Sequence, residues 1–238
     1  MRDSGRMLAT VLQTLVSRAM PGMSTKDLAS IAALELKALG GKASFLGYQG
    51  FPDVLCVSLN NEVVHGIPNK ERVISDGDIL SMDFGVTYKG MITDGARSMI
   101  VGKPKQQRHK ELVERTERSL TAGIGAVHDK VRTGDIGAAV QAVLDKFRYG
   151  IVRDLVGHGV GHHLHEDPNI PNYGRPNTGP WLSAGMTIAI EPMSTLGTDN
   201  VAVARDGWTI LTADGSWSAH FEHTVLITDD GAEILTSL

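Results

Sequence analysis

The spacing of apolar residues over the first forty positions predicts two helices. Apolar side chains recur every three or four positions from Leu8 to Val16, which is typical of an amphipathic helix over about 7–20. Pro21-Gly22 ends this helix, because proline and glycine interrupt helical hydrogen bonding. A second helix follows, with Ser24 as its N-cap and Gly40-Gly41 at its end.

The pattern then changes to short apolar runs separated by glycines, which is typical of β-strands. We expect a strand at Val54–Leu59, followed by a turn at Asn60-Asn61. From Leu80 to Asp94 the pattern predicts two strands joined by a tight turn at Lys89-Gly90.

This hairpin carries two acids, Asp83 and Asp94. If two residues form the turn, Asp83 pairs with Ala96, which lies two residues after Asp94. Side chains two positions apart point to the same face of a strand, so both carboxylates project from one face. They repel each other unless a positive charge lies between them. For the hairpin alone, a pair of solvated acids on an exposed face is the alternative.

Helical spacing returns at about 106–130 and 135–148, and from Gly150 onward the chain is rich in strands and loops. We expect a loop over 168–180, because proline, asparagine and glycine are frequent there. Strands are expected near 186–191, 200–212 and 219–228. The succession of helices and strands thus occurs twice, which predicts a single α+β domain over 1–238 with two halves of similar architecture.

Composition and charge narrow the function classes. Of 238 residues, 42 % are hydrophobic and 21 % charged, as expected of a globular protein with a sizeable core. A net charge of −4 gives no reason to expect nucleic acid as the main ligand. The single cysteine, Cys56, excludes an intramolecular disulfide and fits a reducing compartment, so we expect a cytoplasmic protein. The apolar positions near the start are interrupted by polar ones, so neither a signal peptide nor a membrane partner is expected.

Three residues of the second half are candidates to complete a metal site with the two aspartates. His158 lies between two glycines, Glu191 ends an apolar strand, and Glu222 begins another. A carboxylate in a buried strand is costly unless it is paired or bound to a cation. Taken singly, His158 is better explained as a hydrogen-bonded core histidine and Glu222 as an edge residue. Together with Asp83 and Asp94, they argue for a dinuclear metal site.

Charge and ligand chemistry agree with two ions. Two divalent ions balance the four carboxylates, and a bound hydroxide leaves the cluster near neutrality with the histidine as a neutral ligand. One imidazole among carboxylates, with no thiolate, favours Mn, Fe or Co and is compatible with Zn. Two ions that share bridging carboxylates activate one water between them.

Two further histidines, His65 and His165, lie in loops flanked by glycine or proline. Their functional interpretation is to hydrogen-bond a substrate carbonyl or amide and stabilise the oxyanion of the transition state. A loop histidine without a role is the alternative that the residues alone leave open.

In residue type and order, these seven positions resemble the active site of type I methionine aminopeptidase. The resemblance runs over about residues 5–236. Its motifs are Phe45-Leu46-Gly47-Tyr48, Phe51-Pro52, Asn61–Pro68, Asp83-Phe84-Gly85, Gly157–Gly161, Leu164–Pro168, Ile190-Glu191-Pro192 and Phe221–Thr224. It implies the pita-bread fold, an α+β domain with pseudo-two-fold related halves around a central curved antiparallel sheet.

The resemblance implies which residues hold the metal ions. Asp83 would bind one ion, and His158 with Glu191 would bind the other. Asp94 and Glu222 would bridge the two. The cofactors would be two divalent ions drawn from Co, Mn, Fe and Zn.

It also implies the catalytic and substrate-binding residues. The catalytic residues would be His65, His165 and Glu191, and both histidines would also bind substrate. His165 would contact the substrate carbonyl, and His65 the scissile amide. The methionine side chain would lie in a pocket formed by Tyr48, Phe51, Cys56, Trp208, Phe45 and Leu164.

The implied function is removal of the N-terminal methionine from nascent proteins whose second residue is small and uncharged. Metal-activated water would attack the first peptide bond. The implied partners are nascent N-termini and the ribosome near its exit tunnel, and we expect a monomer. Phe45, Leu164 and Gly95-Ala96-Arg97 depart from the family pattern and bear on pocket shape and rate. The 31 positions from Glu191 to Glu222 leave no room for an inserted helical subdomain, as in the short bacterial form.

Two other functions fit parts of the pattern. A pita-bread peptidase that cleaves before proline is expected to carry an extra N-terminal domain, for which the residues before Asp83 are too few. The Tyr48/Cys56/Trp208 signature also argues against it. An inactive pita-bread binding protein is expected to have lost metal ligands, whereas all five are present. A peptidase assay with and without chelator separates the three functions.

Overall fold

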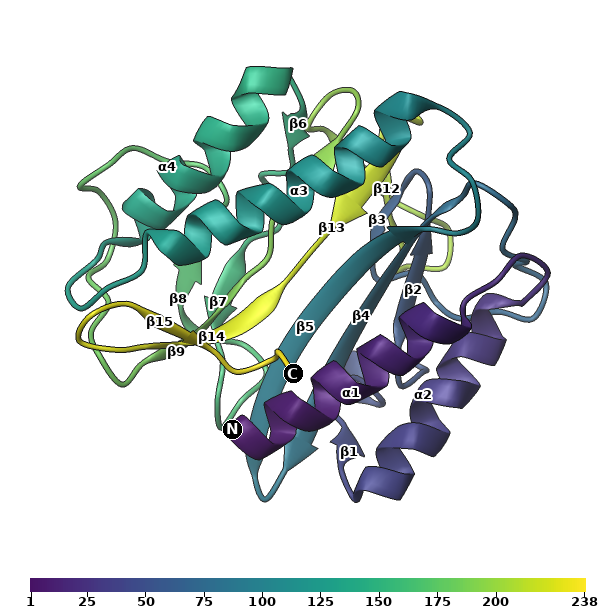
Figure 1. Cartoon of the computed structure of the whole chain (residues 1–238), viewed down its shortest axis with the longest axis horizontal. Helices are drawn as coiled ribbons and strands as arrows, with labels where there is room; N and C mark the ends of the chain where they lie inside the picture. The colour runs from purple at the N-terminus through teal and green to yellow at the C-terminus, as the bar shows by residue number, and fades with distance from the viewer.

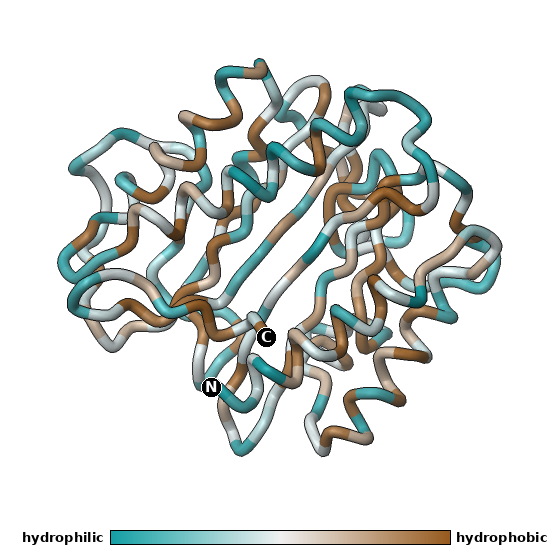
Figure 2. The backbone as a smooth tube through the Cα atoms, in the orientation of Figure 1, coloured by the Kyte–Doolittle hydropathy of each residue, from teal (hydrophilic) through white to brown (hydrophobic).

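The helices cover one face of the strands, which lie behind them in Figure 1. The computed structural model describes all residues, 1–238. Figure 2 shows apolar positions alternating with polar ones along the helices, as expected where one side of each helix is buried. The helices are α1 (Arg2–Arg18), α2 (Thr25–Leu39), α3 (Gln107–Gly125) and α4 (Thr133–Leu144), with 3₁₀ turns η1 (Tyr48–Gly50) and η2 (Asp145–Phe147).

The strands pair antiparallel in four small sheets. The first half of the chain contributes β1 (Lys42–Ala43), β2 (Cys56–Leu59), β3 (Glu62–Val64), β4 (Ile79–Tyr88) and β5 (Met91–Ile100). The second contributes β6 (Gly150–Ile151), β7 (Gly157–Gly159), β8 (Glu166–Ile170), β9 (Thr187–Ile190), β10 (Met193–Thr195), β11 (Val201–Val203), β12 (Ile210–Thr212), β13 (Ser218–His220), β14 (His223–Ile227) and β15 (Ala232–Ile234). The long strand β4 pairs with β1, β2 and β5, whereas the largest sheet has the order β15-β14-β9-β7-β8.

Each half buries its own apolar core. In the first half, α1 and α2 pack on β2 and β4 around fully buried side chains such as Leu15, Leu28 and Phe84. In the second, α3 and α4 pack on β9 and β14 around Ile136 and Val225. The repeated order of helices and strands in the sequence therefore corresponds to two packed units.

Helix α2 has the boundaries that its end signals predict. The Ser24 hydroxyl accepts a hydrogen bond from the Asp27 N–H, and the Asp27 carboxylate accepts one from the Ser24 N–H at 2.8 Å. Gly40 ends the helix in the left-handed conformation with φ 80°.

The two halves meet where β5 lies beside the junction of β13 and β14. Ala96 and Glu222 exchange backbone hydrogen bonds of 3.3 and 2.9 Å. The Thr224 hydroxyl bonds to both the N–H and the carbonyl of Asp94, each at 2.8 Å. This seam places Asp94 and Glu222 next to each other, although they come from different halves.

Several predicted boundaries differ from the structure: α1 begins earlier, at Arg2, α4 ends earlier, at Leu144, and the expected strand 219–228 is interrupted between β13 and β14. The strand expected at Val54–Leu59 is β2 and begins at Cys56, and α3 ends at Gly125 in a glycine-containing last turn. The segment 200–212 forms two strands, because the Asp206 carboxylate accepts hydrogen bonds from two backbone N–H groups and closes a turn at Gly207. The expected loop at 168–180 begins as strand β8, where Pro168 is tolerated because β8 is an edge strand.

Candidate metal centre

A cavity of about 340 Å³ lies between the two halves. Apart from Gln49, its lining consists of the residues that the sequence analysis selected for metal binding, catalysis and the pocket. They are Phe45, Tyr48, Phe51, Cys56, His65, Asp83, Asp94, His158, Leu164, His165, Glu191, Trp208 and Glu222. The fold therefore brings together every predicted site residue, from positions more than a hundred residues apart.

The hairpin places its two acids as its turn chemistry predicts. Lys89 and Gly90 form the turn with φ 49° and 79°, and Asp83 lies opposite Ala96. Both carboxylates face the cavity, and the two residues are only 9 % and 4 % exposed. The alternative of solvated acids on an exposed face is therefore wrong.

His158 lies where three strands approach closely. A Cβ atom at Gly157 would lie 2.3 Å from the Ala189 carbonyl oxygen, so only glycine fits beside the histidine. The His158 Nδ1 lies 2.9 Å from the Gly159 carbonyl oxygen, which can only accept, so Nδ1 carries the proton. The lone pair of Nε2 is then free toward the cavity, which is the tautomer that a metal ligand needs.

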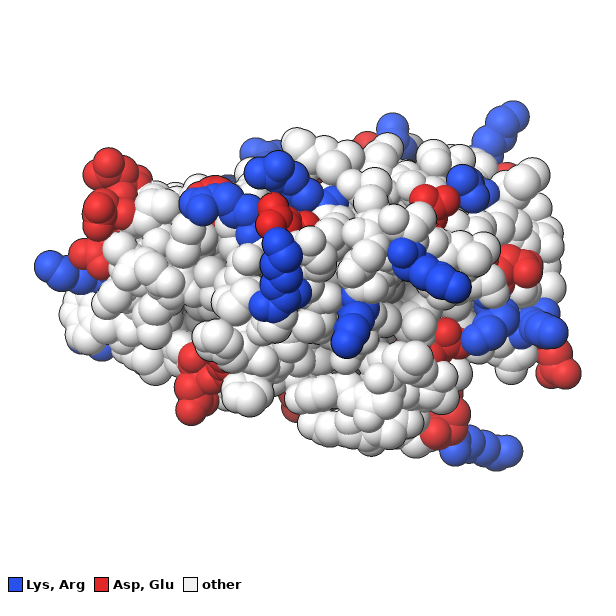
Figure 3. Space-filling model, turned by 90° about the horizontal axis from the view of Figure 1, so that it is seen from below, with Lys and Arg blue, Asp and Glu red and all other residues white.

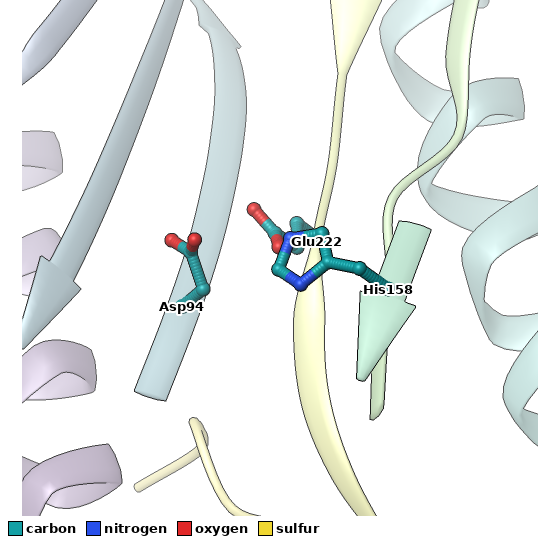
Figure 4. A group of neighbouring side chains, drawn as sticks. All are labelled: Asp94, His158 and Glu222. Carbon is teal, nitrogen blue, oxygen red and sulfur yellow. The ribbon is translucent and has the colours of Figure 1, made fainter. Parts of the chain in front are cut away.

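The two glutamates complete the cluster from β9 and the β13–β14 junction. The Glu191 Oε1 lies 3.5 Å from the His158 Nε2. One ligand atom from each of Asp94, His158 and Glu222 lies within 4.8 Å of the other two. Figure 4 shows these three side chains converging from different strands.

Burial and mutual repulsion dominate the electrostatics of the cluster. Burial raises the pKa of Asp83, Glu191 and Glu222 well above their usual values, and the Asp94 charge raises each further. Burial raises the pKa of Asp94 itself to about 7. The Asp83 Oδ1 and the Glu222 Oε1 are buried without any hydrogen-bond partner. Unpartnered carboxylate oxygens gathered in this way can hold a cation.

His65 and His165 border the cluster on the side of the cavity. His65 adopts a left-handed backbone with φ 59°, an uncommon conformation for a residue with a Cβ. Burial lowers its pKa to about 4 and also lowers the pKa of His165, so both are neutral near pH 7. The His165 Nδ1 lies 2.9 Å from the Tyr48 hydroxyl.

Apart from Gln49, the rest of the lining is aromatic or apolar. Phe51 packs edge-on against Trp208 at a centroid distance of 5.2 Å. Phe45 packs directly over Gly85, where a Cβ atom would lie 2.7 Å from its ring. Burial raises the pKa of the Cys56 thiol well above its usual value, so it stays protonated. The chain therefore presents an apolar pocket immediately beside the carboxylates.

Two residues near the site were not selected from the sequence. Gln49 lines the cavity from η1. His220 is 1 % exposed, and its Nε2 lies 3.6 Å from the Glu191 Oε2. Its place two residues before Glu222 was the only signal for His220, and nothing in the local pattern distinguished Gln49.

Two global features bear on partners. No helix is both long and apolar enough to cross a membrane. Positive and negative side chains are intermingled on the face shown in Figure 3, with no large area of one sign. That face therefore lacks the basic stripe typical of nucleic-acid binding.

Comparisons with known proteins agree with this site. Residues 1–229 match the metallopeptidase family M24. A methionine aminopeptidase of Clostridium acetobutylicum is 44 % identical over 99 % of this chain and 94 % of that protein. The crystal structure of methionine aminopeptidase from Thermotoga maritima has a TM-score of 0.98 and 45 % identity, and the match covers 100 % of this chain and 95 % of that one.

A more distant likeness concerns the fold alone. A prolidase from Pyrococcus furiosus has a TM-score of 0.78 at 21 % identity, with all of this chain matched to 62 % of the prolidase. The expected α+β pita-bread fold is thereby confirmed. From family match, relatives and site together, the chain belongs to metallopeptidase family M24 and, within it, to the methionine aminopeptidases.

Proposed function

We propose that this protein removes the N-terminal methionine from polypeptides by metal-dependent hydrolysis of the first peptide bond. The observation that carries the proposal is the buried carboxylate cluster beside an apolar pocket. Neither feature alone specifies the reaction. A cation site adjoining a pocket for an apolar side chain is what an exopeptidase specific for methionine needs.

The residues present fit two divalent ions. Four carboxylates and one imidazole supply oxygen and nitrogen ligands, and two buried carboxylate oxygens lack any other partner. In our assignment Asp83 belongs to one ion and His158 with Glu191 to the other. Asp94 and Glu222, adjacent across the seam, would bridge the two ions. When bound, the ions supply an activated water and polarise the substrate carbonyl.

The histidines act on the substrate. With the Tyr48 hydroxyl donating to Nδ1, the Nε2 of His165 carries the ring proton and donates to the developing oxyanion. His65, which lines the same cavity, hydrogen-bonds the scissile amide. Because both rings are neutral near pH 7, neither adds a positive charge that would repel the cations.

The apolar part of the cavity receives the methionine side chain. Tyr48, Phe51, Cys56 and Trp208 form it, and Phe45 and Leu164 lie beside them. A thioether is polarisable and packs well against aromatic rings, so this lining suits methionine better than a charged side chain. The family resemblance adds that the second residue of the substrate must be small.

The natural substrates are the N-termini of nascent chains, and we place the enzyme in the cytoplasm, near the ribosomal exit tunnel, as a monomer. The single buried cysteine suits that reducing compartment. In the cell the enzyme uses two divalent ions, drawn from Co, Mn, Fe and Zn.

Metal analysis of protein purified without added metal, combined with assays on Met-Ala-Ser and Ala-Pro peptides, tests the proposal. We expect metal-dependent release of methionine from Met-Ala-Ser, loss of activity with a chelator, and no cleavage of Ala-Pro. Cleavage of Ala-Pro would favour the prolidase-like alternative. A protein that binds metal and cleaves neither peptide would be a binding protein.

A further inference from the structure

His220 is a buried histidine to which the proposed reaction assigns no role. It ends β13 and is held at the seam between the halves, where the Ser98 hydroxyl accepts from its N–H at 2.9 Å and donates to its carbonyl at 2.7 Å. Its backbone is therefore fixed on both sides. Neither ring nitrogen has a hydrogen-bond partner, although the residue is only 1 % exposed. An orphaned imidazole in such a place calls for an explanation.

The group that the ring faces is the carboxylate of Glu191. The His220 Nε2 lies 3.6 Å from the Glu191 Oε2, whereas the Glu191 Oε1 lies 3.5 Å from the His158 Nε2. The carboxylate is thus held between two imidazoles, one on each oxygen. His158 lines the cavity, whereas His220 is not among the lining residues.

We infer that His220 is a positioning residue, which donates its Nε2–H to the Glu191 Oε2 and so holds Oε1 toward the metal centre. This inference rests on the proposed function, because it requires Glu191 to be a metal ligand. A neutral imidazole has one N–H, so no charge on His220 is needed. An approach of a few tenths of an ångström brings the pair to ordinary hydrogen-bond length. A donor on the far oxygen fixes the rotation of the carboxylate and leaves the near oxygen free for the cation.

Direct ligation by His220 does not fit this geometry. Its Nε2 lies 3.6 Å from the Glu191 Oε2, whereas His158 approaches the Oε1, and His220 is not among the residues that line the cavity. His220 therefore acts through Glu191 and touches neither substrate nor reacting atoms.

The test compares Co²⁺ binding by four variants of the full chain. His220→Leu removes the donor at similar bulk, and His220→Gln keeps an N–H at similar reach. Glu191→Gln tests the ligand itself. His109→Leu is the matched control, because His109 is also a buried histidine (4 % exposed) whose Nδ1 has no hydrogen-bond partner, and it stacks on Trp217 outside the cavity. Calorimetry with the metal alone measures affinity, and the visible absorption of bound Co²⁺ reports ligand geometry.

We expect His220→Leu to weaken Co²⁺ binding by about 10–100-fold and to change the Co²⁺ absorption, as loss of a partner behind a ligand typically does. His220→Gln should stay close to the parent protein, and His109→Leu should match it. The inference is overturned if His220→Leu binds Co²⁺ like the parent with an unchanged spectrum, or if His220→Gln is as weak as His220→Leu. If His220→Leu does not fold, His220→Asn replaces it, because its amide is one carbon too short to reach; equal affinities for Asn and Gln overturn the inference.

The same experiment separates this inference from the proposed function. Loss of Co²⁺ binding in Glu191→Gln without any change in His220→Leu overturns only the role of His220. Unchanged Co²⁺ binding in Glu191→Gln overturns the assignment of Glu191 as a ligand. The role of His220 and the metal assignment in the proposed function then both lose their basis.

Discussion

The cavity has two walls on which burial has opposite energetic effects. The carboxylate wall consists of Asp83, Asp94, Glu191 and Glu222, and the apolar wall consists of Phe45, Phe51, Cys56 and Leu164 with Tyr48 and Trp208. All of the carboxylates are withdrawn from water with raised pKa values. The apolar wall loses nothing by the same withdrawal, because burial of its side chains stabilises the fold.

The difference shows where function and stability conflict in this protein. Like charges that share one buried site destabilise the metal-free fold, unless they are protonated or a cation compensates for them. The apolar wall serves the fold and the substrate at once. Changes to the carboxylate wall should therefore remove activity without lowering metal-free stability, whereas changes to the apolar wall should lower both.

The largest effect should come from the bridging carboxylates. Asp94→Asn and Glu222→Gln each remove a charge shared by both ions, so activity at ordinary metal concentrations should be abolished. Metal-free melting temperatures should be unchanged or higher, because one buried repulsion is lost. Assays in metal-limited buffer and calorimetric melting measure both.

Asp78→Asn is the matched control for these variants. Asp78 is equally buried, but its carboxylate pairs with the Lys105 ammonium at 2.6 Å. Burial raises its pKa, but hydrogen bonds from Lys105, Ser75 and Asn60 together hold the pKa below its usual value. This variant should lose stability and keep metal binding. A wild-type rate for Asp94→Asn in metal-limited buffer would contradict the dinuclear assignment.

His165→Ala tests whether His165 acts on the substrate or binds metal. Loss of one oxyanion donor typically lowers the rate by about 10²–10³-fold, and we expect that loss here with metal content unchanged. Turnover and metal stoichiometry should be measured on the same preparation. If both fall in parallel, His165 is a ligand and its assigned role is wrong.

Phe51→Ala should affect both fold and substrate binding. Truncation of a buried phenylalanine typically costs about 3–5 kcal/mol of stability, and the emptied pocket should raise KM for methionyl peptides by about 10–200-fold. Leu112→Ala is the control, because Leu112 is fully buried outside the cavity. It should lower stability by about 2–5 kcal/mol and leave KM unchanged. An unchanged KM in Phe51→Ala would place the methionine pocket elsewhere.

The smallest effect concerns the pH dependence of metal-free stability. A group whose folded pKa is raised stabilises the fold while it is protonated, and this contribution is lost as pH rises through that pKa. For Asp94 the loss extends from the unfolded value of 3.8 to about 7. The buried histidines act in the opposite direction, but only between their folded pKa of about 4 and the unfolded value of 6.5.

Above pH 6.5 only the carboxylate wall still titrates, so the free energy of unfolding of metal-free protein should fall between pH 6.5 and about pH 8. Denaturant melts over this range measure the slope. Asp94→Asn should flatten it, and saturating Mn²⁺ should abolish it. A slope that is the same in parent and variant would mean that Asp94 does not titrate in this range.

The sequence by itself determined two kinds of feature. Some depend on interactions between residues close together in the chain, and others follow from an order of site residues that is shared with a known family. The Lys89-Gly90 turn sets the register of β4 and β5, and with it the shared face of Asp83 and Asp94. The Ser24 cap likewise sets the start of α2. Turn and cap chemistry act over a few residues, so a local pattern suffices to predict them. The order of site residues along the chain, through its resemblance to a known family, was enough to predict all of the cavity lining except Gln49, although not its geometry.

Only the tertiary structure decided which residues meet across the seam. Asp94 and Thr224 are 130 positions apart, and their hydrogen bonds, with the adjacent pairing of Ala96 and Glu222, bring the bridging acids together. The same seam places the His220 ring next to the Glu191 carboxylate. Apolar periodicity shows that a strand has a buried face, but it does not show which distant strand covers that face, because many pairings bury the same area. The contacts that complete this metal centre are of that kind.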